Sequence, residues 1–284
     1  MRSVHLLPIL TALLFATPAL ADAPARARGA ATAAAKVDPA LAAAIADPLR
    51  KEDRARDVWR KPAETLSFFQ VGPEMKVGEY APGGEWYSRL LGLYLGPKGK
   101  LVGLYFNPTH SAFPVDRQQA IRDSAAKYPS DIAGWSGLPA ERFTGMTLET
   151  IPEAEKGTFD RILVMRMMHN LLRWNIADSE IKAMRSLLKD GGLLGIEQHR
   201  ARTDAPFAYA DGSKGYLREA DVIKFMEVHG FDYVGSSDAN ANPKDTANHP
   251  EGVWELPPVL RTKREELKSI GESDRMTLLF RKRA

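Results

Sequence analysis

Short apolar runs alternate along the chain with stretches in which apolar residues recur every three or four positions. The runs predict strands over residues 75–80, 101–106, 142–144, 159–165, 193–197, 231–235 and 276–280. The helical spacing predicts helices over residues 86–95, 116–127, 178–188 and 219–229. This order indicates an α/β fold: a Rossmann-like, seven-stranded, mostly parallel sheet with helices on both faces and an antiparallel edge strand.

Three short helices are expected before the first strand, because prolines suited to a first helical turn stand at positions 39, 48 and 62. In the second of these segments we expect Leu49, Val58 and Trp59 to face the body of the protein. In the third we expect Leu66, Phe68 and Phe69 to be buried.

The first residues resemble a secretory signal. Arg2 precedes an apolar stretch over residues 6–15, and Ala19-Leu20-Ala21 offers small residues at the cleavage position. We therefore predict a signal peptide over residues 1–21, an Ala/Pro-rich linker over 22–46, a main domain over 47–284, and a periplasmic or secreted location. The alternatives are an uncleaved anchor or a buried helix. No later segment is apolar enough to predict a membrane span.

Composition narrows the chemistry. The chain has no cysteine, which excludes thiolate nucleophiles, zinc–cysteine sites and iron–sulfur clusters. The net charge is only +3, and the basic residues are scattered apart from Arg281-Lys282-Arg283. We therefore expect no nucleic-acid partner.

The most informative turn joins the first strand to the first helix of the sheet and reads Ala81-Pro82-Gly83-Gly84. Small residues let the backbone approach a ligand closely, and free N–H groups at a helix start can meet a carboxylate or phosphate. In parallel sheets the ligand crevice lies at the carboxyl ends of the strands, where the strand order reverses. The alternative is a glycine turn with no ligand.

The stretch from Glu79 to Tyr87, E-x-x-P-G-G-x-W-Y, resembles the first motif of class I S-adenosylmethionine-dependent methyltransferases. It is most similar to a group of predicted exported methyltransferases. Further pieces agree in order: Arg56-Asp57, Pro62-x-Glu64-x-Leu66-x-Phe68-Phe69, Asp160, Arg166-Met167-Met168-His169-Asn170, Gly191-Gly192, Gly230-Phe231, Ser236-x5-Asn242-Pro243-x-Asp245 and Ser273-Asp274-Arg275-Met276. The resemblance covers residues 47–283.

The resemblance implies S-adenosylmethionine as cofactor and methyl transfer to an acceptor of unknown identity. Glu79 would orient the methionine end, Asn107 would grip the ribose hydroxyls, and Met146 and Thr147 would lie near the adenine. Residues 166–170 would form the floor of the site, with His169 facing the methyl group or the substrate. The complete implied cofactor set is Glu79, Tyr80, Ala81, Pro82, Gly83, Gly84, Trp86, Asn107, Met146, Thr147 and Arg166.

Several positions depart from the family pattern. Ala81 and Glu85 replace glycines of the turn, Asn107 replaces an acid, and Met146 stands where an acid is common. Asn107 still offers a hydrogen bond, but one without charge assistance. These departures favour an alternative in which the chain is a non-catalytic binding protein on the same fold.

His169 is the candidate catalytic residue, because a histidine can accept a proton near neutral pH. A hydrogen-bonded structural histidine and a pure substrate contact are the alternatives. Glu197 and His199 fall on one face of a predicted strand, but no third ligand has suitable spacing, so we predict no metal site.

Overall fold

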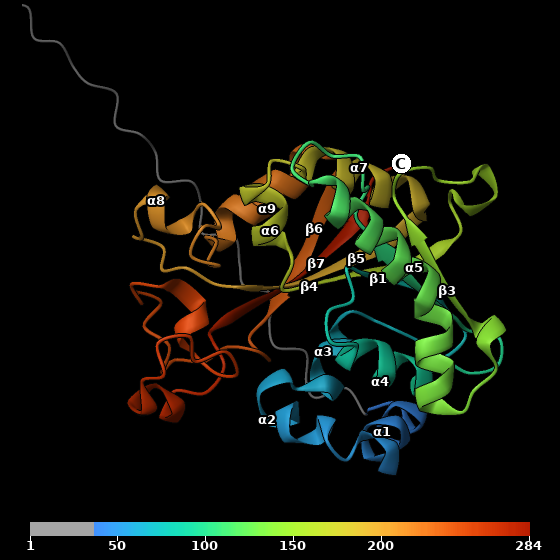
Figure 1. Ribbon diagram of the computed structural model, residues 1–284, viewed down its shortest axis with the longest axis horizontal. Coiled ribbons are helices and arrows are strands. Elements are labelled where there is room, and N and C mark those ends of the chain that lie inside the picture. Colours follow the sequence, from blue (N-terminus) through green and yellow to red (C-terminus); the bar gives the residue numbers. More distant parts are fainter. Residues whose placement is uncertain (1–36) are drawn as a thin grey trace, which may run out of the picture.

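The computed structural model describes residues 37–284 (Figure 1). The predicted signal peptide and residues 22–36 of the predicted linker lie outside this range. Residues 39–46 form helix α1, whose Leu41 and Ala44 are buried against the rest of the domain. Asp38 caps this helix and Pro39 opens it, as the sequence predicts.

The described residues form one seven-stranded sheet in the order β3-β2-β1-β4-β5-β7-β6. Its strands are β1 (Lys76–Tyr80), β2 (Lys100–Tyr105), β3 (Phe143–Thr147), β4 (Phe159–Met165), β5 (Leu188–His199), β6 (Phe231–Ser237) and β7 (Arg275–Lys282). Strands β1 to β5 pair in parallel, and β7 runs antiparallel between β5 and β6. The predicted fold class is confirmed.

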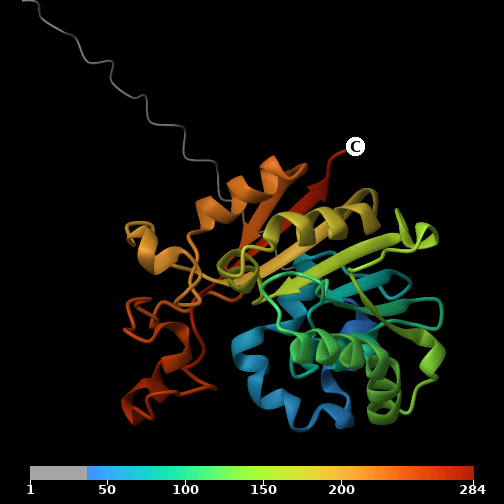
Figure 2. The same cartoon turned by 45° about the horizontal axis from the view of Figure 1, so that its top comes forward.

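Helices cover both faces of this sheet (Figure 2). The helices are α1 (Pro39–Ala46), α2 (Asp57–Arg60), α3 (Pro62–Phe68), α4 (Trp86–Tyr94), α5 (Val115–Ser136), α6 (Met168–Arg173), α7 (Ala177–Leu187), α8 (Phe207–Ala210) and α9 (Glu219–Val228). Short 3₁₀ turns are η1 (Pro48–Arg50), η2 (Asp53–Arg56), η3 (Ala140–Arg142), η4 (Glu153–Glu155), η5 (Gly252–Glu255) and η6 (Glu265–Ser269). One core cluster joins the sheet to α6, α7 and α9, and another joins it to α1, α3 and α4.

The N-terminal turns bury different residues from those predicted. Leu49 and Val58 are 49% and 57% exposed, whereas Arg50 and Arg60 are buried. Both guanidinium groups stack on the Trp86 indole, with centroid distances of 4.9 and 4.7 Å. Arginine side chains therefore form the inward face of this segment, because the face of the Trp86 ring stabilises their positive charge. Leu66 and Phe69 are buried as predicted, whereas Trp59 and Phe68 are only half-buried.

A lobe over residues 240–272 flanks the carboxyl edge of the sheet (Figure 1). Its centre is the buried carboxylate of Asp245, which accepts hydrogen bonds from the Tyr216 hydroxyl and from the backbone N–H of Ala247 and Asp274. His249 lies 3.0 Å from the same carboxylate. Within residues 37–284, no helix has the length and apolar character required to cross a bilayer.

Candidate functional site

The β1–α4 turn leaves the sheet beside the point where the strand order reverses, between β1 and β4. Ala81, Gly84 and Glu85 all have left-handed backbone angles, with φ of 48°, 65° and 55°. The Ala81 N–H donates to the Leu104 carbonyl of β2, which fixes the start of the turn. Alanine therefore occupies a position that favours glycine, held by the neighbouring strand.

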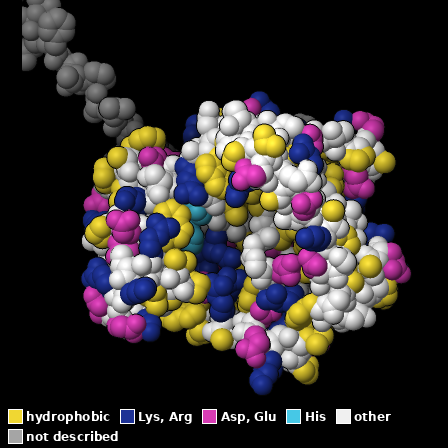
Figure 3. All heavy atoms as spheres, viewed as in Figure 1, with side chains coloured by type: hydrophobic (Ala, Val, Ile, Leu, Met, Phe, Trp, Pro, Cys, Tyr) yellow, Lys and Arg dark blue, Asp and Glu magenta, His cyan; other side chains and the backbone are white. Residues whose placement is uncertain are grey.

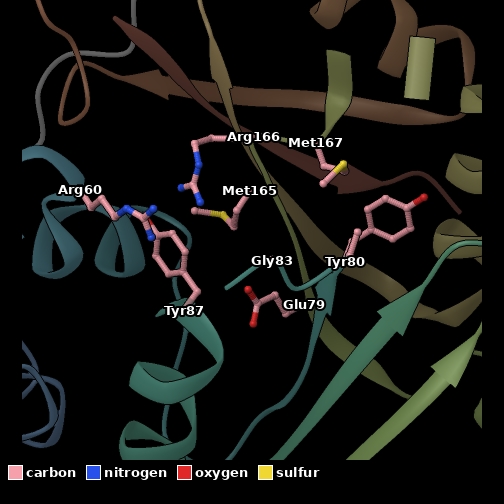
Figure 4. A pocket seen from close by; sticks show the side chains of 9 residues that line it. Arg60, Glu79, Tyr80, Gly83, Tyr87, Met165, Arg166 and Met167 are labelled. Atoms are coloured by element: carbon pink, nitrogen blue, oxygen red, sulfur yellow. The ribbon is translucent and has the colours of Figure 1, made fainter. Parts of the chain in front are cut away.

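A cavity of about 140 Å³ opens beside this turn (Figure 4). Its wall consists of Arg60, Glu79, Tyr80, Ala81, Gly83, Tyr87, Met165, Arg166 and Met167. Drug-sized ligands usually occupy at least about 300 Å³, so this cavity accommodates one end of a larger ligand. In the space-filling view, Lys and Arg side chains gather in a hollow at the centre of the molecule (Figure 3).

Glu79 is the penultimate residue of β1, and its side chain points toward the cavity (Figure 4). The side chain is buried, and the Ser88 hydroxyl donates a hydrogen bond to Oε2. Burial raises the pKa of Glu79 to about 7, against the opposing effects of Ser88, Arg166 and Arg60. Glu79 therefore changes charge near neutral pH.

Tyr80 follows Glu79 and points to the opposite face of the sheet, as strand alternation requires. Its hydroxyl donates to Glu180 of α7 at 2.6 Å, and Figure 4 shows its ring turned away from the cavity. Tyr80 thus borders the cavity while its phenol contributes to the opposite core.

A buried network around Glu197 supports the cavity wall. Glu197 ends the parallel register of β5 beside β4, and its Oε1 lies 2.7 Å from Arg275 Nη1. The Tyr87 hydroxyl donates to Oε2 at 3.1 Å, and Arg166 Nη1 lies 3.5 Å from the same oxygen. This one carboxylate orients two cavity residues from different elements, Tyr87 of α4 and Arg166 after β4.

Five of the residues predicted to bind a cofactor lie together in the cavity wall: Glu79, Tyr80, Ala81, Gly83 and Arg166. Pro82 and Gly84 belong to the same turn but not to the wall. Trp86 is placed elsewhere: its indole is buried and donates to the Asp53 carbonyl at 2.9 Å. Helical spacing explains this, because the first turn of α4 directs Trp86 toward the N-terminal turns.

The predicted contacts from β2 and β3 also lie outside this wall. Asn107 Oδ1 accepts hydrogen bonds from the N–H and hydroxyl of Thr109, so the amide already completes a local turn. Met146 packs against the core, and Thr147 ends β3 at the sheet's edge. Glu85 is likewise not in the wall, and its carboxylate lies 3.9 Å from Arg89 Nη1.

His169 lies in the first turn of α6 and is buried, outside the cavity wall. Gln198 Nε2 donates to the Gly215 and His199 carbonyls, which directs Gln198 Oε1 to the His169 backbone N–H and to Nδ1. The proton is thereby assigned to Nδ1, and Nε2 is left as an acceptor. Burial lowers the His169 pKa to about 4, so the ring is neutral at pH 7.

His199 and Glu197 do not act as a pair. His199 Nδ1 lies 2.6 Å from the Ser273 hydroxyl, and its ring is 5.5 Å from that of His169. Glu197 instead faces Arg275, Tyr87 and Arg166. No group of three or more His, Asp or Glu side chains in residues 37–284 is arranged to hold a metal ion.

Two members of the wall, Arg60 and Met165, were not predicted as cavity residues. Tyr87 was considered as a core or site-wall residue, and Met167 belongs to the residues 166–170 that the resemblance places at the floor of the site. Tyr87 and Met167 do stand within the motifs quoted above, which was the available signal. Arg60 gave no such signal, because it comes from a short N-terminal helix and reaches the cavity only in the folded molecule.

Comparison with known proteins supports the architecture. No family model matches the chain, and no curated protein matches it in sequence. Among solved structures, the [4+2]-cyclase SpnF has a TM-score of 0.50 at 16% identity, over 86% of this chain and 95% of SpnF. A SAM-dependent methyltransferase from Aquifex aeolicus has a TM-score of 0.48 at 15% identity, over 87% of this chain and 99% of that protein.

A third similar structure is the arsenic(III) S-adenosylmethionine methyltransferase CrArsM from Chlamydomonas reinhardtii. Its TM-score is 0.47 at 14% identity, over 88% of this chain and 75% of that protein. At 16% identity, the similarity to SpnF concerns the fold alone. The chain therefore has the Rossmann-like fold found in SpnF, and its chemistry must be argued from its own site.

Proposed function

We propose that the chain binds S-adenosylmethionine at the β1–α4 turn and directs methyl transfer to an acceptor. One observation carries the proposal: the acid of Glu79 and the bare backbone at Gly83 face one cavity at the strand-order reversal. Glu79 suits the methionine ammonium, and the turn can meet the cofactor closely because Gly83 has no side chain. The position of these groups agrees with the family resemblance.

S-Adenosylmethionine supplies an electrophilic methyl group when bound. The chain's residues then have to align the acceptor, which can provide much of the acceleration. We propose His169 Nε2 as the group that takes a proton from the acceptor, because it is an unprotonated acceptor at neutral pH. Met167, two residues before it, lines the cavity.

Gly83→Val tests this binding site. A Cβ at Gly83 would meet only the Ala81 carbonyl oxygen, at 3.8 Å, so the variant should fold while its side chain narrows the cavity. Calorimetric titration should show micromolar binding of S-adenosylmethionine and S-adenosylhomocysteine to the wild type, weakened at least about tenfold in the variant. Gly134→Val is the control, because Gly134 is exposed on α5 with open space around it. Absence of binding to the wild type at millimolar ligand would refute the proposal.

The second candidate is a binding protein without methyl transfer. Asn107 favours it, because its Oδ1 is already used by Thr109 and it carries no charge for a ribose. That the fold supports another reaction is illustrated by SpnF, which is named as a cyclase. Under this reading, the titrations above would show no nucleoside binding.

We also propose that the chain is exported. The support is the basic, apolar and small-residue order of residues 1–21. Expression of the full chain in a bacterium should yield periplasmic protein whose intact mass corresponds to a start at Asp22. Full-length protein confined to the cytoplasm would contradict this.

A further inference from the structure

Arg60 is a buried guanidinium with few polar contacts. It is 2% exposed, and its Nε and Nη1 have no hydrogen-bond partner among the described residues. Its ion pair with Glu272 is long, with 3.9 Å between Nε and Oε2. Glu272 is closer to Arg56, at 2.6 Å, and to Arg275, at 3.1 Å. The negative charge nearest Arg60 is therefore already shared by two other arginines.

Aromatic rings hold Arg60 in place without satisfying its N–H groups. The guanidinium carbon lies 4.7 Å from the Trp86 ring centroid and 5.9 Å from that of Tyr87. Stacking stabilises the cation through its face but leaves the hydrogen-bond donors at its edge free. Figure 4 shows this guanidinium above the Tyr87 ring, at the wall of the cavity.

Arg166, the residue that follows β4, brings a second guanidinium to the same cavity wall, near that of Arg60 (Figure 4). Its backbone has φ of 55°, and its N–H donates to the Glu197 carbonyl. Its side chain reaches Glu197 only at 3.5 Å, and that carboxylate is also paired with Arg275. Two arginines thus face a cavity whose remaining charged group is Glu79.

The surroundings of Arg60 lower its pKa. Burial, followed by the charges of Arg166 and Arg56, lowers the pKa of Arg60 to about 9. A buried charge that lacks a partner is costly, and such groups are normally paired or hydrogen-bonded. An anion entering the cavity would supply the missing partner.

We propose that Arg60 and Arg166 bind a carboxylate group of the ligand that enters this cavity. The planar guanidinium matches a carboxylate with two parallel donors. A carboxylate would bring a negative charge to Arg60, whose ion pair with Glu272 is 3.9 Å long, and a cavity of about 140 Å³ suits a small anionic group. The carboxylate can come from the methionine end of the cofactor or from the acceptor, and the two sources are separable.

The carboxylate itself is tested on the full chain by thermal unfolding. Acetate should raise the unfolding temperature of the wild type above that in acetamide, its neutral counterpart, at equal ionic strength and pH. Arg60→Gln should abolish this difference, and Arg60→Lys, which keeps the charge but not the planar fork, should reduce it. Arg54→Gln, an exposed change in the preceding turn, should leave it intact. Equal effects of acetate and acetamide on the wild type would overturn the proposal.

The source is tested with two nucleosides. A cofactor carboxylate predicts that Arg60→Gln weakens S-adenosylhomocysteine binding at least about tenfold but leaves 5′-methylthioadenosine, which lacks the amino-acid end, unchanged. An acceptor carboxylate predicts that both nucleosides bind the variant as they bind the wild type, while the acetate response is lost. If neither nucleoside binds even the wild type, methyl transfer fails as a function, and the acetate comparison still decides the carboxylate site.

Discussion

Glu79→Gln is expected to raise the free energy of unfolding at pH 8 by about 3 kcal/mol, because the buried carboxylate must be ionised there. Burial raises the Glu79 pKa from an ordinary 4.5 to about 7, and each pKa unit corresponds to about 1.4 kcal/mol. Glutamine is neutral and nearly the same shape, and its carbonyl oxygen can still accept the hydrogen bond of Ser88. Denaturant unfolding of both proteins measures the difference.

The pH dependence gives this expectation its sign. The folded state of the wild type holds the Glu79 proton more tightly than the unfolded state does. The contribution of this proton to the free energy of unfolding is therefore fully present below pH 4.5 and is lost as the pH rises through about 7. His169 acts oppositely: its folded pKa of about 4 lies below the ordinary 6.5, so stability is lost as the pH falls through that range. The contribution of His169 is the same in both proteins, so the difference in free energy of unfolding between Glu79→Gln and the wild type reports on Glu79 alone.

A matched control is Glu153→Gln, whose carboxylate is 85% exposed. It should shift stability by no more than about 0.5 kcal/mol at any pH. The Glu79→Gln difference should vanish near pH 4, and a constant difference from pH 4 to 8 would contradict the burial argument. On the proposed function, the same variant should bind S-adenosylmethionine more weakly, since the amide offers no charge to the methionine ammonium. A stabilising change that weakens binding is the behaviour expected of a functional residue.

The sheet could be predicted because its strands are apolar runs separated by turn residues. The predicted run over 159–165 is β4 itself, Phe159–Met165. Helix α5 was predicted to stop at residue 127 but extends to Ser136, past Pro129. Tyr128 and Ile132 are buried, so packing sustains the helix through a residue that local propensity disfavours.

The site was predictable only where it is local in sequence. Glu79, Ala81 and Gly83 come from one strand end and its turn; the small residues of the turn indicated Ala81 and Gly83, and the family resemblance added Glu79. Arg60 was not predictable, because hydrophobic periodicity directs apolar residues inward and treats arginine as exposed. Its burial depends on Trp86, which lies 26 positions later in the sequence.

The family resemblance implies that Asn107 contacts the ribose, but its amide is used by a local turn. A resemblance in sequence does not show which local partner a side chain already has. Together with Arg60, it shows that the charged groups of the cavity wall come from β1, from α2 and from the residue after β4, and that Asn107 is not in the wall. On the proposed function, these charged groups are the ones available to the amino-acid end of the cofactor.

Glu197→Leu is expected to lower the free energy of unfolding by about 3–5 kcal/mol, because removing one partner of a buried ion pair leaves the other charge buried without its counter-ion. Arg275 is 1% exposed and would keep only Glu272, at 3.1 Å, and the Trp59 carbonyl, at 2.7 Å. The Tyr87 hydroxyl would lose its acceptor as well. Denaturant unfolding measures the loss, with Glu153→Leu as the exposed control.

The double variant Glu197→Leu/Arg275→Met distinguishes two causes of this loss: the unpaired charge of Arg275 and the lost packing of the Glu197 side chain. Replacing both partners of a buried pair with apolar residues is often neutral or stabilising, so the double variant should recover most of the loss. If it is less stable than Glu197→Leu alone, Arg275 is satisfied by Glu272, and the network does not depend on Glu197. A third outcome is that the double variant recovers stability but has the same unfolding temperature in acetate as in acetamide. Glu197 then serves chiefly to orient Arg166 toward the cavity, because Arg166 Nη1 would have lost its 3.5 Å partner.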